Sequence, residues 1–268
     1  MAQLSIGLVG LGKMGAPIAG HILKAGYALY VHDLDGFKVK TLAEQGAHAC
    51  SSTAALAEQC DIAIVMVGYD HELREICVDE NGLFANMASG TVLVVCSTVK
   101  QSTIVELEGV ARRKGIALLD TPVTRAEQGA IAGNLLMLGS GDLTAFEKAR
   151  PVFHTFCTDI FHLGPAGCGQ VGKLIHNILL WVSVVANHEA FSLADKCGVD
   201  KTVLAQAIKM STGANGTIGY FQTMTMPWVQ KDLSLALEFA ETLEIGLPLT
   251  GLAKQLVKVM GLPKNLNA

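Results

Sequence analysis

The sequence contains few charged and few aromatic residues. Charged residues occupy 16% and aromatic residues 6% of its 268 positions, and the formal net charge is −4. It has no run of basic residues, whereas a nucleic-acid-binding surface needs clustered lysine and arginine. We therefore expect no nucleic-acid partner. Half of the residues are hydrophobic, which is ample for the core of one large domain or two ordinary ones.

Paired metal-binding cysteines and a targeting segment are also missing. The seven cysteines are scattered and never spaced C-x-x-C, so we predict reduced thiols and no metal site. The N-terminal stretch "MAQLSIGLVGLG" has no basic segment or cleavage site, so we expect no secretory signal. The apolar stretch 178–186 is bounded by Asn177, Asn187 and His188 and is too short to cross a bilayer. These features predict a cytoplasmic protein without a membrane segment.

The first part of the chain alternates between strand and helix patterns. Residues 62–67 and 91–96 are continuous apolar runs, which is typical of strands buried on both faces. Strands are also expected at 4–10, 28–32, 116–119 and 135–138, and helices at 13–25, 36–45, 72–77 and 102–114. This β-α-β order predicts an α/β fold with a parallel, doubly wound sheet.

The second part is helical throughout. Residues 169–197 form one long apolar helical pattern, and helices follow at 201–210, 231–243 and 249–259. We place the boundary at "LGPAGCGQ", giving a Rossmann domain over residues 1–163 and an all-helical substrate and oligomerisation domain over 164–268. The long helix is too apolar to stand alone in water, which indicates burial between domains or between subunits.

A glycine-rich loop, "GLVGLGKMGAPIAG", links the first predicted strand to the first helix. Gly10 allows the tight turn, Gly12 lets the backbone approach a pyrophosphate, and Gly15 lets helix and strand pack closely. The start of the helix then offers N–H groups to phosphate oxygens. The expected cofactor-binding residues of this loop are Gly10, Leu11, Gly12, Lys13, Met14 and Gly15.

Asp33 lies at the end of the second predicted strand. A carboxylate there accepts hydrogen bonds from a ribose diol and repels a 2′-phosphate, so NAD is favoured over NADP. The alternative is that Asp33 only caps a helix or a turn.

Five stretches in order resemble the β-hydroxyacid dehydrogenase family. They are "GLGKMGAPIAGHILKAGY" (10–27), "STV" (97–99), "DTPVTRAEQGAIAGNLLMLGSG" (120–141), "GPAGCGQVGKLIHN" (164–177) and "KDLSLAL" (231–237). The resemblance implies hydride transfer between NAD and a small anionic 3-hydroxy acid or its semialdehyde, in a homodimer or homotetramer. It also implies that Val67, Thr98 and Lys231 contact the cofactor, with the "STV" loop on the nicotinamide side.

The resemblance assigns catalysis to Lys173. An ammonium group can protonate a developing alkoxide, and the neutral amine can take the proton back in oxidation. Asn177 lies one helical turn later on the same face, where it can bind substrate or orient the lysine. The competing interpretation is a solvated lysine at the start of a helix.

Thr124 and Arg125 stand where the usual family members have Ser and Gly. Thr124 keeps a hydroxyl group for substrate binding, and Arg125 adds a charge-assisted donor. This loop resembles that of sulfolactaldehyde reductases, so Arg125 is expected to bind a sulfonate, a phosphate or a second carboxylate. The alternative is a salt bridge with Glu127 or another acid.

The stretch between residues 211–216 and the Lys231 motif is shorter than in the family, and this leaves the role of Lys231 open. Two functions other than a dehydrogenase are compatible with parts of the sequence. An imine reductase shares the fold, but Lys173 argues against it. A catalytically silent NAD(P)-binding scaffold is favoured by the shortened stretch and disfavoured by the presence of Lys173 and Asn177.

Overall fold

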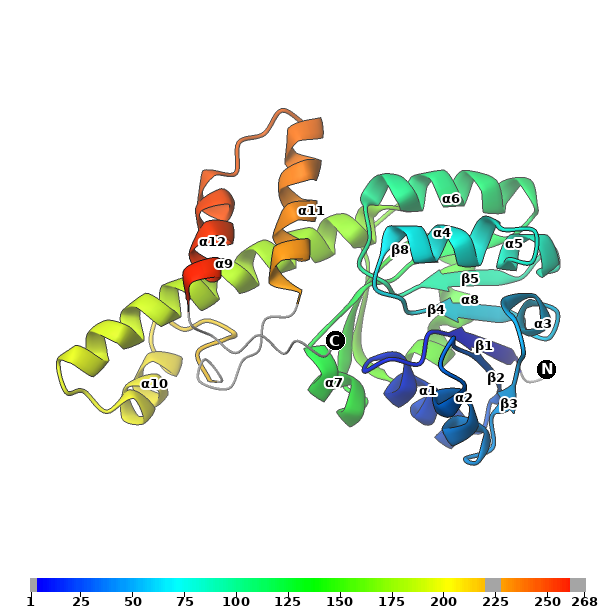
Figure 1. Cartoon of the computed structure of the whole chain (residues 1–268), viewed down its shortest axis with the longest axis horizontal. Coiled ribbons are helices and arrows are strands. Elements are labelled where there is room, and N and C mark those ends of the chain that lie inside the picture. The colour runs from blue at the N-terminus through cyan, green and yellow to red at the C-terminus, as the bar shows by residue number, and fades with distance from the viewer. Residues whose placement is uncertain (1–3, 220–227, 261–268) are drawn as a thin grey trace. The chain divides into compact units, whose positions relative to one another are not determined.

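The computed structural model describes residues 4–219 and 228–260, and it divides the chain into two compact units (Figure 1). The first unit comprises residues 1–173 and the second residues 174–268. Residues 220–227 of the shortened stretch before Lys231 lie outside the described residues, and so does the segment 261–268.

A single twisted sheet organises the first unit. Its order is β3-β2-β1-β4-β5-β6-β8-β7, with β9 paired to β8. The strands are β1 (Ser5–Val9), β2 (Ala28–His32), β3 (His48–Ala49), β4 (Ile62–Val65), β5 (Val92–Val95), β6 (Ala117–Asp120), β7 (Val123–Thr124), β8 (Leu135–Gly141) and β9 (Cys157–His162). The pairs from β3 to β6 are all parallel. The order 3-2-1-4-5-6 is that of a dinucleotide-binding fold, whose ligand site lies at the carboxyl ends of β1 and β4.

Helices cover both faces of this sheet. One hydrophobic cluster joins the sheet to α1 (Gly15–Lys24), α2 (Gly36–Ala43), α7 (Ala126–Ala132) and α8 (Leu143–Phe153). The other joins it to α3 (Thr53–Ala57), α4 (Asp70–Val78), α5 (Leu83–Asn86) and α6 (Gln101–Arg113). Every residue of β4 and β5 is buried, because helices pack on both sides of them. The predicted α/β class and doubly wound sheet are confirmed.

The far end of the sheet departs from the prediction. The strand expected at 135–138 was taken to continue the parallel sheet, but β8 runs antiparallel to both β6 and β7. Hydrophobic periodicity identifies a strand without fixing its direction, which here depends on the reversal of the chain through β7 and α7. Strand β9 was not predicted, because "CTDIFH" is only partly buried and has no apolar run.

The second unit is helical over the residues that the structure describes. Helix α9 (Cys168–Lys196) begins in the first unit and continues through the second, and it is followed by α10 (Lys201–Lys209), α11 (Val229–Thr242) and α12 (Pro248–Val259). Trp181 and Val185 of α9 pack with Leu233 of α11 and Val257 of α12. Each helix lies within a few residues of its predicted position.

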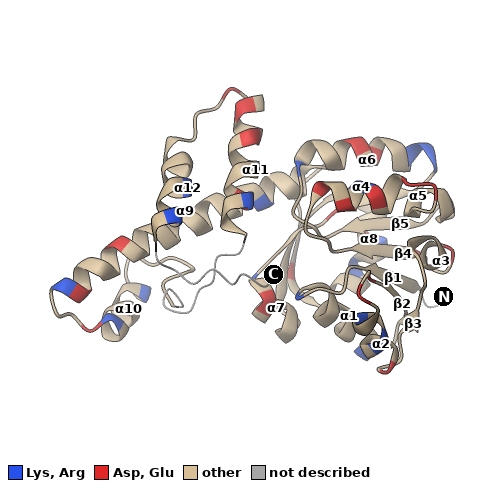
Figure 2. Cartoon of the chain, in the orientation of Figure 1, with Lys and Arg blue, Asp and Glu red and all other residues tan. Residues whose placement is uncertain are grey.

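Helix α9 has the length that was predicted for it, but it is more apolar than the predicted absence of a membrane segment allowed. Among the described residues it is the one helix long and apolar enough to cross a membrane. An 18-residue stretch of it has a mean hydropathy of 1.3, and 39% of that stretch is buried. The prediction counted only the apolar stretch 178–186 and took Asn177, Asn187 and His188 as its limits, but these uncharged side chains leave the mean hydropathy of a longer window of α9 high. Charged residues are confined to a few positions of α9 (Figure 2). Core helices satisfy the same criterion.

Candidate functional site

The glycine loop has the backbone geometry that a dinucleotide requires. Gly10 follows β1 with φ of +93°, and a Cβ atom there would collide with the carbonyl oxygen of Met66. A Cβ atom on Gly15 would collide with the carbonyl oxygen of Gly10. By contrast, a Cβ atom on Gly12 would meet nothing within 4 Å. The turn is therefore closed against the protein at Gly10 and Gly15 and open at Gly12, where a pyrophosphate would approach.

The start of α1 is prepared for an anion. No side chain caps it, and no acidic residue lies in its first turn. An uncapped helix start offers N–H groups and a positive dipole end, which fits a phosphate. Lys13 is exposed in the loop, Met14 is half-buried, and Leu11 is buried with its N–H directed to Asp33.

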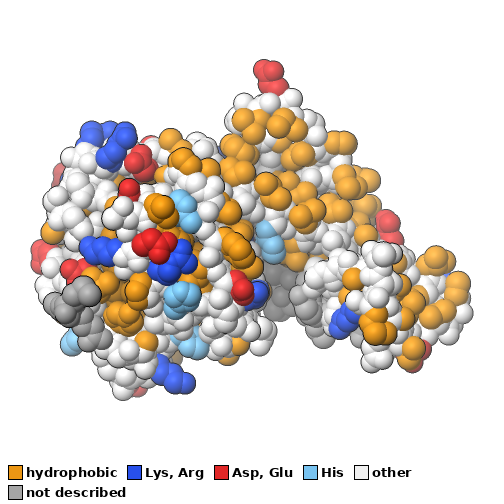
Figure 3. Space-filling view, turned by 180° about the vertical axis from the view of Figure 1, so that it is seen from behind, with side chains coloured by type: hydrophobic (Ala, Val, Ile, Leu, Met, Phe, Trp, Pro, Cys, Tyr) orange, Lys and Arg blue, Asp and Glu red, His pale blue; other side chains and the backbone are white. Residues whose placement is uncertain are grey.

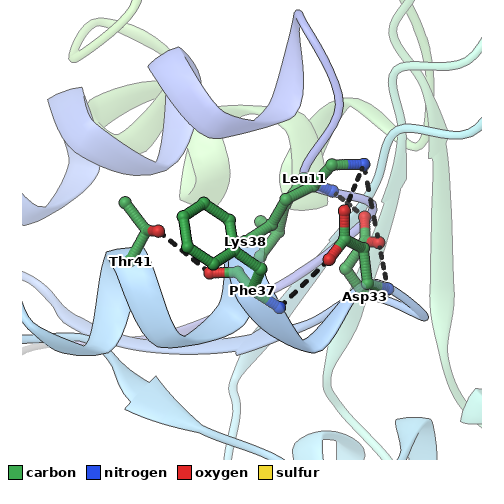
Figure 4. Close-up of polar contacts among 6 residues, drawn as sticks. Leu11, Asp33, Phe37, Lys38 and Thr41 are labelled. Carbon is green, nitrogen blue, oxygen red and sulfur yellow. Dashed lines mark hydrogen bonds and ion pairs between the residues drawn. The ribbon is translucent and has the colours of Figure 1, made fainter.

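Asp33 joins the second strand to the glycine loop (Figure 4). Its Oδ2 accepts a hydrogen bond from the Leu11 N–H at 2.6 Å, and its Oδ1 accepts one from the Asp35 N–H at 2.8 Å. Oδ1 also lies 3.9 Å from the Nζ of Lys38. The helix cap of α2 is Asp35, not Asp33, because Asp35 accepts from the Phe37 N–H. Asp33 thus lies at the end of β2 with its carboxylate beside the loop, where a ribose diol binds in this fold.

Replacing Asp33 with serine is expected to reduce the preference for NAD over NADP. The variant loses charged hydrogen bonds to the ribose, which would weaken NAD binding by about 10- to 100-fold. It also removes the carboxylate, 3.9 Å from the Lys38 Nζ, that would repel a 2′-phosphate. Dissociation constants for both cofactors measure this change. Glu44→Gln, which removes an exposed carboxylate that pairs with Lys40 rather than Lys38, is the control and should leave the NAD:NADP ratio unchanged. An unchanged ratio in Asp33→Ser would contradict the assignment.

The loops after β4 and β5 are joined by a hydrogen bond. The Val67 N–H donates to the Oγ of Ser97 at 2.7 Å. Val67 and Thr98 therefore lie at the carboxyl ends of adjacent parallel strands, on the edge of the sheet where this fold binds its cofactor. Both remain predicted cofactor contacts.

Lys173 contacts the predicted substrate loop. Its Nζ donates to the carbonyl oxygen of Val123 at 2.7 Å, and its side chain is half-buried on the second turn of α9. Thr124, the next residue of the loop, is buried within β7. The fold thus brings together two predicted site segments that are far apart in sequence.

Asn177 presents an unsatisfied polar atom. Its side chain is 1% exposed, and its Nδ2 has no hydrogen-bond partner among the described residues. A buried amide without a partner is costly, so such a group points to a ligand. It lies one turn after Lys173 on α9, which fits the predicted role in substrate binding.

The Nη1 atom of Arg125 is bound by groups of the protein. Its Nη1 forms an ion pair with Asp159 at 2.7 Å and donates to the carbonyl of Asn134 and the hydroxyl of Thr158. The acid that the salt-bridge alternative requires is therefore Asp159 and not Glu127. Arg125 also has φ of +79°, in the left-handed region that favours glycine. This backbone accounts for the glycine that usual family members have at this position.

Asp120, Gln170 and Ser140 form a buried polar cluster at the start of α9 that was not predicted from the sequence. Asp120 ends β6 with no exposed surface, and its carboxylate accepts from both the backbone N–H and the side-chain amide of Gln170 and from the hydroxyl of Ser140. Burial raises the pKa of Asp120 to about 6, although these hydrogen bonds lower it. The position of Asp120 at the end of an apolar strand was the one local feature that could have indicated a buried acid here. Its partners are too distant in sequence to be inferred.

This cluster makes stability depend on pH. Because the folded-state pKa of Asp120 is raised to about 6 from 3.8, its protonation favours the folded state as the pH falls through 6, and the gain levels off below 3.8. Relative to Asp120→Asn, wild type should gain about 2 kcal/mol of unfolding free energy between about pH 7 and pH 4.5. Denaturant unfolding of both proteins at both pH values measures this gain, and a pH-independent difference would refute it.

Lys231 lies near the start of α11 in the second unit. Its Nζ is 5.3 Å from the ring centroid of Trp228, a cation–π distance. The adjacent Asp232 accepts a hydrogen bond from the Trp181 indole at 3.2 Å. The Lys-Asp motif is thus anchored to α9, while the cofactor contact expected of Lys231 stays a prediction. No group of three or more His, Cys, Asp or Glu that could hold a metal occurs within residues 4–219 and 228–260.

Two family profiles match nearly the whole chain. Residues 5–164 match the NAD binding domain of 6-phosphogluconate dehydrogenase, and residues 167–265 match the family described as NAD-binding of NADP-dependent 3-hydroxyisobutyrate dehydrogenase. The fold and these matches define a two-domain, NAD-dependent dehydrogenase. The chain belongs to the β-hydroxyacid dehydrogenase family, and it is an oxidoreductase of hydroxy acids that uses NAD.

Individual relatives agree with this assignment. The chain is 35% identical to the NAD-dependent L-serine dehydrogenase of Pseudomonas aeruginosa, covering 95% of this chain and 91% of the relative. It is also 35% identical to a 3-hydroxyisobutyrate dehydrogenase of the same organism, covering 94% and 90%. Among solved structures, the Mycobacterium tuberculosis 3-hydroxyisobutyrate dehydrogenase with L-serine matches with a TM-score of 0.87 and 26% identity, covering 96% of this chain and 94% of that chain.

Proposed function

We propose that this enzyme interconverts a small anionic 3-hydroxy acid and its semialdehyde, with Lys173 as general acid and base. The observation that carries the proposal is the bond from the Lys173 Nζ to the Val123 carbonyl at 2.7 Å. It holds the ammonium group at the loop where the family binds substrate. The relatives named for L-serine, 3-hydroxyisobutyrate and 2-(hydroxymethyl)glutarate support this class, because each name describes a carboxylate with a hydroxyl on its β-carbon.

The proposed chemistry divides between cofactor and protein. The glycine loop and Asp33 would hold the cofactor, whose oxidised form would supply a hydride acceptor for the carbinol carbon and whose reduced form would supply the hydride for the reverse reaction. Lys173 takes the hydroxyl proton in oxidation and supplies it in reduction. The unsatisfied Nδ2 of Asn177 donates to a substrate oxygen, and the hydroxyl of Thr124 is a further donor for the carboxylate. The rigid helix keeps Lys173 and Asn177 at one spacing.

Arg125 is proposed to select the anionic end of the substrate through its Nε and Nη2, because Nη1 is engaged by Asp159, Thr158 and Asn134. A guanidinium group binds sulfonates, phosphates and carboxylates through such paired donors. A sulfonated hydroxy acid is therefore included among the candidate substrates.

Steady-state kinetics with a substrate panel tests the proposal. The panel contains 3-hydroxyisobutyrate, glycerate, L-serine, threonate and a sulfonated hydroxy acid, each with NAD and with NADP. Turnover with at least one of them and NAD is expected. Arg125→Gly, which suits the left-handed backbone, should lower kcat/KM for the best substrate by about 10- to 100-fold. An unchanged KM would assign Arg125 to the ion pair alone. NAD binding without any turnover would support the silent scaffold.

We further propose a cytoplasmic homodimer or homotetramer. Ile175, Leu179 and Leu193 of α9 are each more than half exposed, and hydrophobic side chains are spread over the helical unit (Figure 3). Such surface is commonly buried between subunits. Light scattering on the purified protein measures the assembly, and a monomer at micromolar concentration would contradict it.

A further inference from the structure

The side chain of Gln170 connects the loop after β5 to the start of α9. Its Oε1 accepts from the Val99 N–H at 3.0 Å, and its Nε2 donates to the Ser97 carbonyl at 3.0 Å. The same Nε2 donates to Oδ1 of Asp120 at 2.6 Å. Gln170, Ser97 and Asp120 are all at most 1% exposed.

This arrangement uses both N–H donors and one oxygen lone pair of a primary amide. An amide has two N–H donors, and both are engaged here, one by Ser97 and one by Asp120. A flipped amide would set its NH₂ group against the Val99 N–H and its oxygen against a carboxylate. The Asp120 carboxylate therefore fixes the orientation of the Gln170 side chain, and water cannot replace any of these bonds at such burial.

The backbone of Gln170 is held as firmly as its side chain. Its N–H donates to Oδ2 of Asp120 at 2.9 Å, while the Gly169 N–H donates to the hydroxyl of Ser140 at 2.9 Å. These two acceptors cap the start of α9. Lys173 follows Gln170 by one turn on the same helix, so the cap also sets the position of Lys173.

We propose that Gln170, oriented by Asp120, is a positioning residue that aligns the Ser97–Val99 loop with Lys173. The loop is the expected neighbour of the nicotinamide, and Lys173 is the proposed proton carrier, so the inference rests on the proposed function. We call the hydrogen bonds of Gln170 to Val99, Ser97 and Asp120 the clamp. The clamp connects the Ser97–Val99 loop to the start of α9, which carries Lys173, and all of these residues belong to the first unit. Loss of this alignment slows the chemical step, because a displacement of about 1 Å can cost on the order of 100-fold in rate.

Substitution of Gln170 with methionine tests the clamp. Methionine matches the length of the side chain but forms none of the three amide bonds. We expect kcat to fall about 10-fold or more, with NAD binding retained, and the primary deuterium isotope effect on kcat to rise when the carbinol hydrogen is replaced. An isotope effect reports on the hydride step, which a loss of stability alone would not change. If Gln170→Met does not fold, Gln170→Asn takes its place, because it keeps a neutral amide but is one methylene too short to bridge Val99, Ser97 and Asp120 together.

Ser5→Ala is the control for a loss of stability alone. It removes the hydrogen bond from the Ser5 Oγ to Asp61 Oδ2 at 2.8 Å, at the start of β1 and without contact to Gln170, Asp120 or the Ser97–Val99 loop, so it should lower stability and leave the isotope effect unchanged. Wild-type kcat and isotope effect in a folded Gln170 variant would overturn the clamp, even if Lys173→Ala is inactive. Activity retained by Lys173→Ala would instead overturn the proposed function, and the isotope effect would still decide whether Gln170 aligns the loop.

Discussion

Replacement of Lys173 with alanine is expected to lower kcat by about 10²- to 10⁴-fold, the usual contribution of a general acid or base. The Nζ lies at the substrate loop through its bond to the Val123 carbonyl. The variant leaves the glycine loop and Asp33 intact, so NAD should bind as in wild type. Single-turnover reduction of NAD in the presence of the best substrate measures the chemical step directly.

The control for Lys173→Ala lies on the same helix. Lys196 is the exposed basic residue of the last turn of α9, and Lys196→Ala should leave kcat unchanged. Added primary amines should partly restore the activity of Lys173→Ala, since they can carry the missing proton. If Lys173→Ala kept more than a tenth of wild-type kcat, far more than a lost general acid would leave, the proton carrier would have to be sought elsewhere.

Gly15→Ala is expected to have the largest effect on folding. The added methyl group would collide with the carbonyl oxygen of Gly10, a residue whose own α-carbon leaves no room for a side chain beside the Met66 carbonyl. Backbone atoms on both sides leave no flexible neighbour to move aside. A destabilisation of about 3 kcal/mol or more is therefore expected, together with loss of NAD binding. Denaturant unfolding and calorimetric titration with NAD provide the two measurements.

Substitutions of Gly20 and Gly12 distinguish an effect on helix packing from an effect on cofactor binding. A Cβ atom on Gly20, also on α1, meets nothing within 4 Å, so Gly20→Ala should stabilise the helix by up to about 1 kcal/mol. Gly12→Ala should fold normally and bind NAD more weakly, because its open side faces the pyrophosphate. Wild-type stability of Gly15→Ala would show that β1 and α1 do not pack as described.

The fold around the predicted nucleotide-binding loop could be predicted from the sequence because its signals are local. The glycine spacing, the acid after β2 and the continuous apolar runs of β4 and β5 each depend on neighbouring residues. Their placement in a parallel sheet then follows from the β-α-β order. The length of α9 was also predictable, since no proline or charge run interrupts its pattern and its two glycines, Gly169 and Gly172, lie near its start.

The remaining contacts depend on pairings that periodicity does not encode. The antiparallel direction of β8 and the existence of β9 are set by tertiary pairing. The choice of Asp159 as the partner of Arg125 depends on β9, which was not predicted. Likewise, Gln170 reaches Asp120 and Ser97 across 50 and 73 positions of sequence, and a single sequence carries no signal at such separations.

The course of α9 limits how this protein can be divided into modules. The family profiles change between residues 164 and 167, and the sequence predicted a boundary after 163, whereas the compact units divide after Lys173. A fragment ending at 163 would keep every glycine of the cofactor loop but lose Gln170, which would remove two hydrogen bonds from the Asp120 carboxylate and the acceptor of the Val99 N–H. The first turn of α9 is thus structurally part of the Rossmann domain. Exchange of helical domains between relatives, in evolution or by recombination, is better tolerated after Lys173 than at the apparent linker before it.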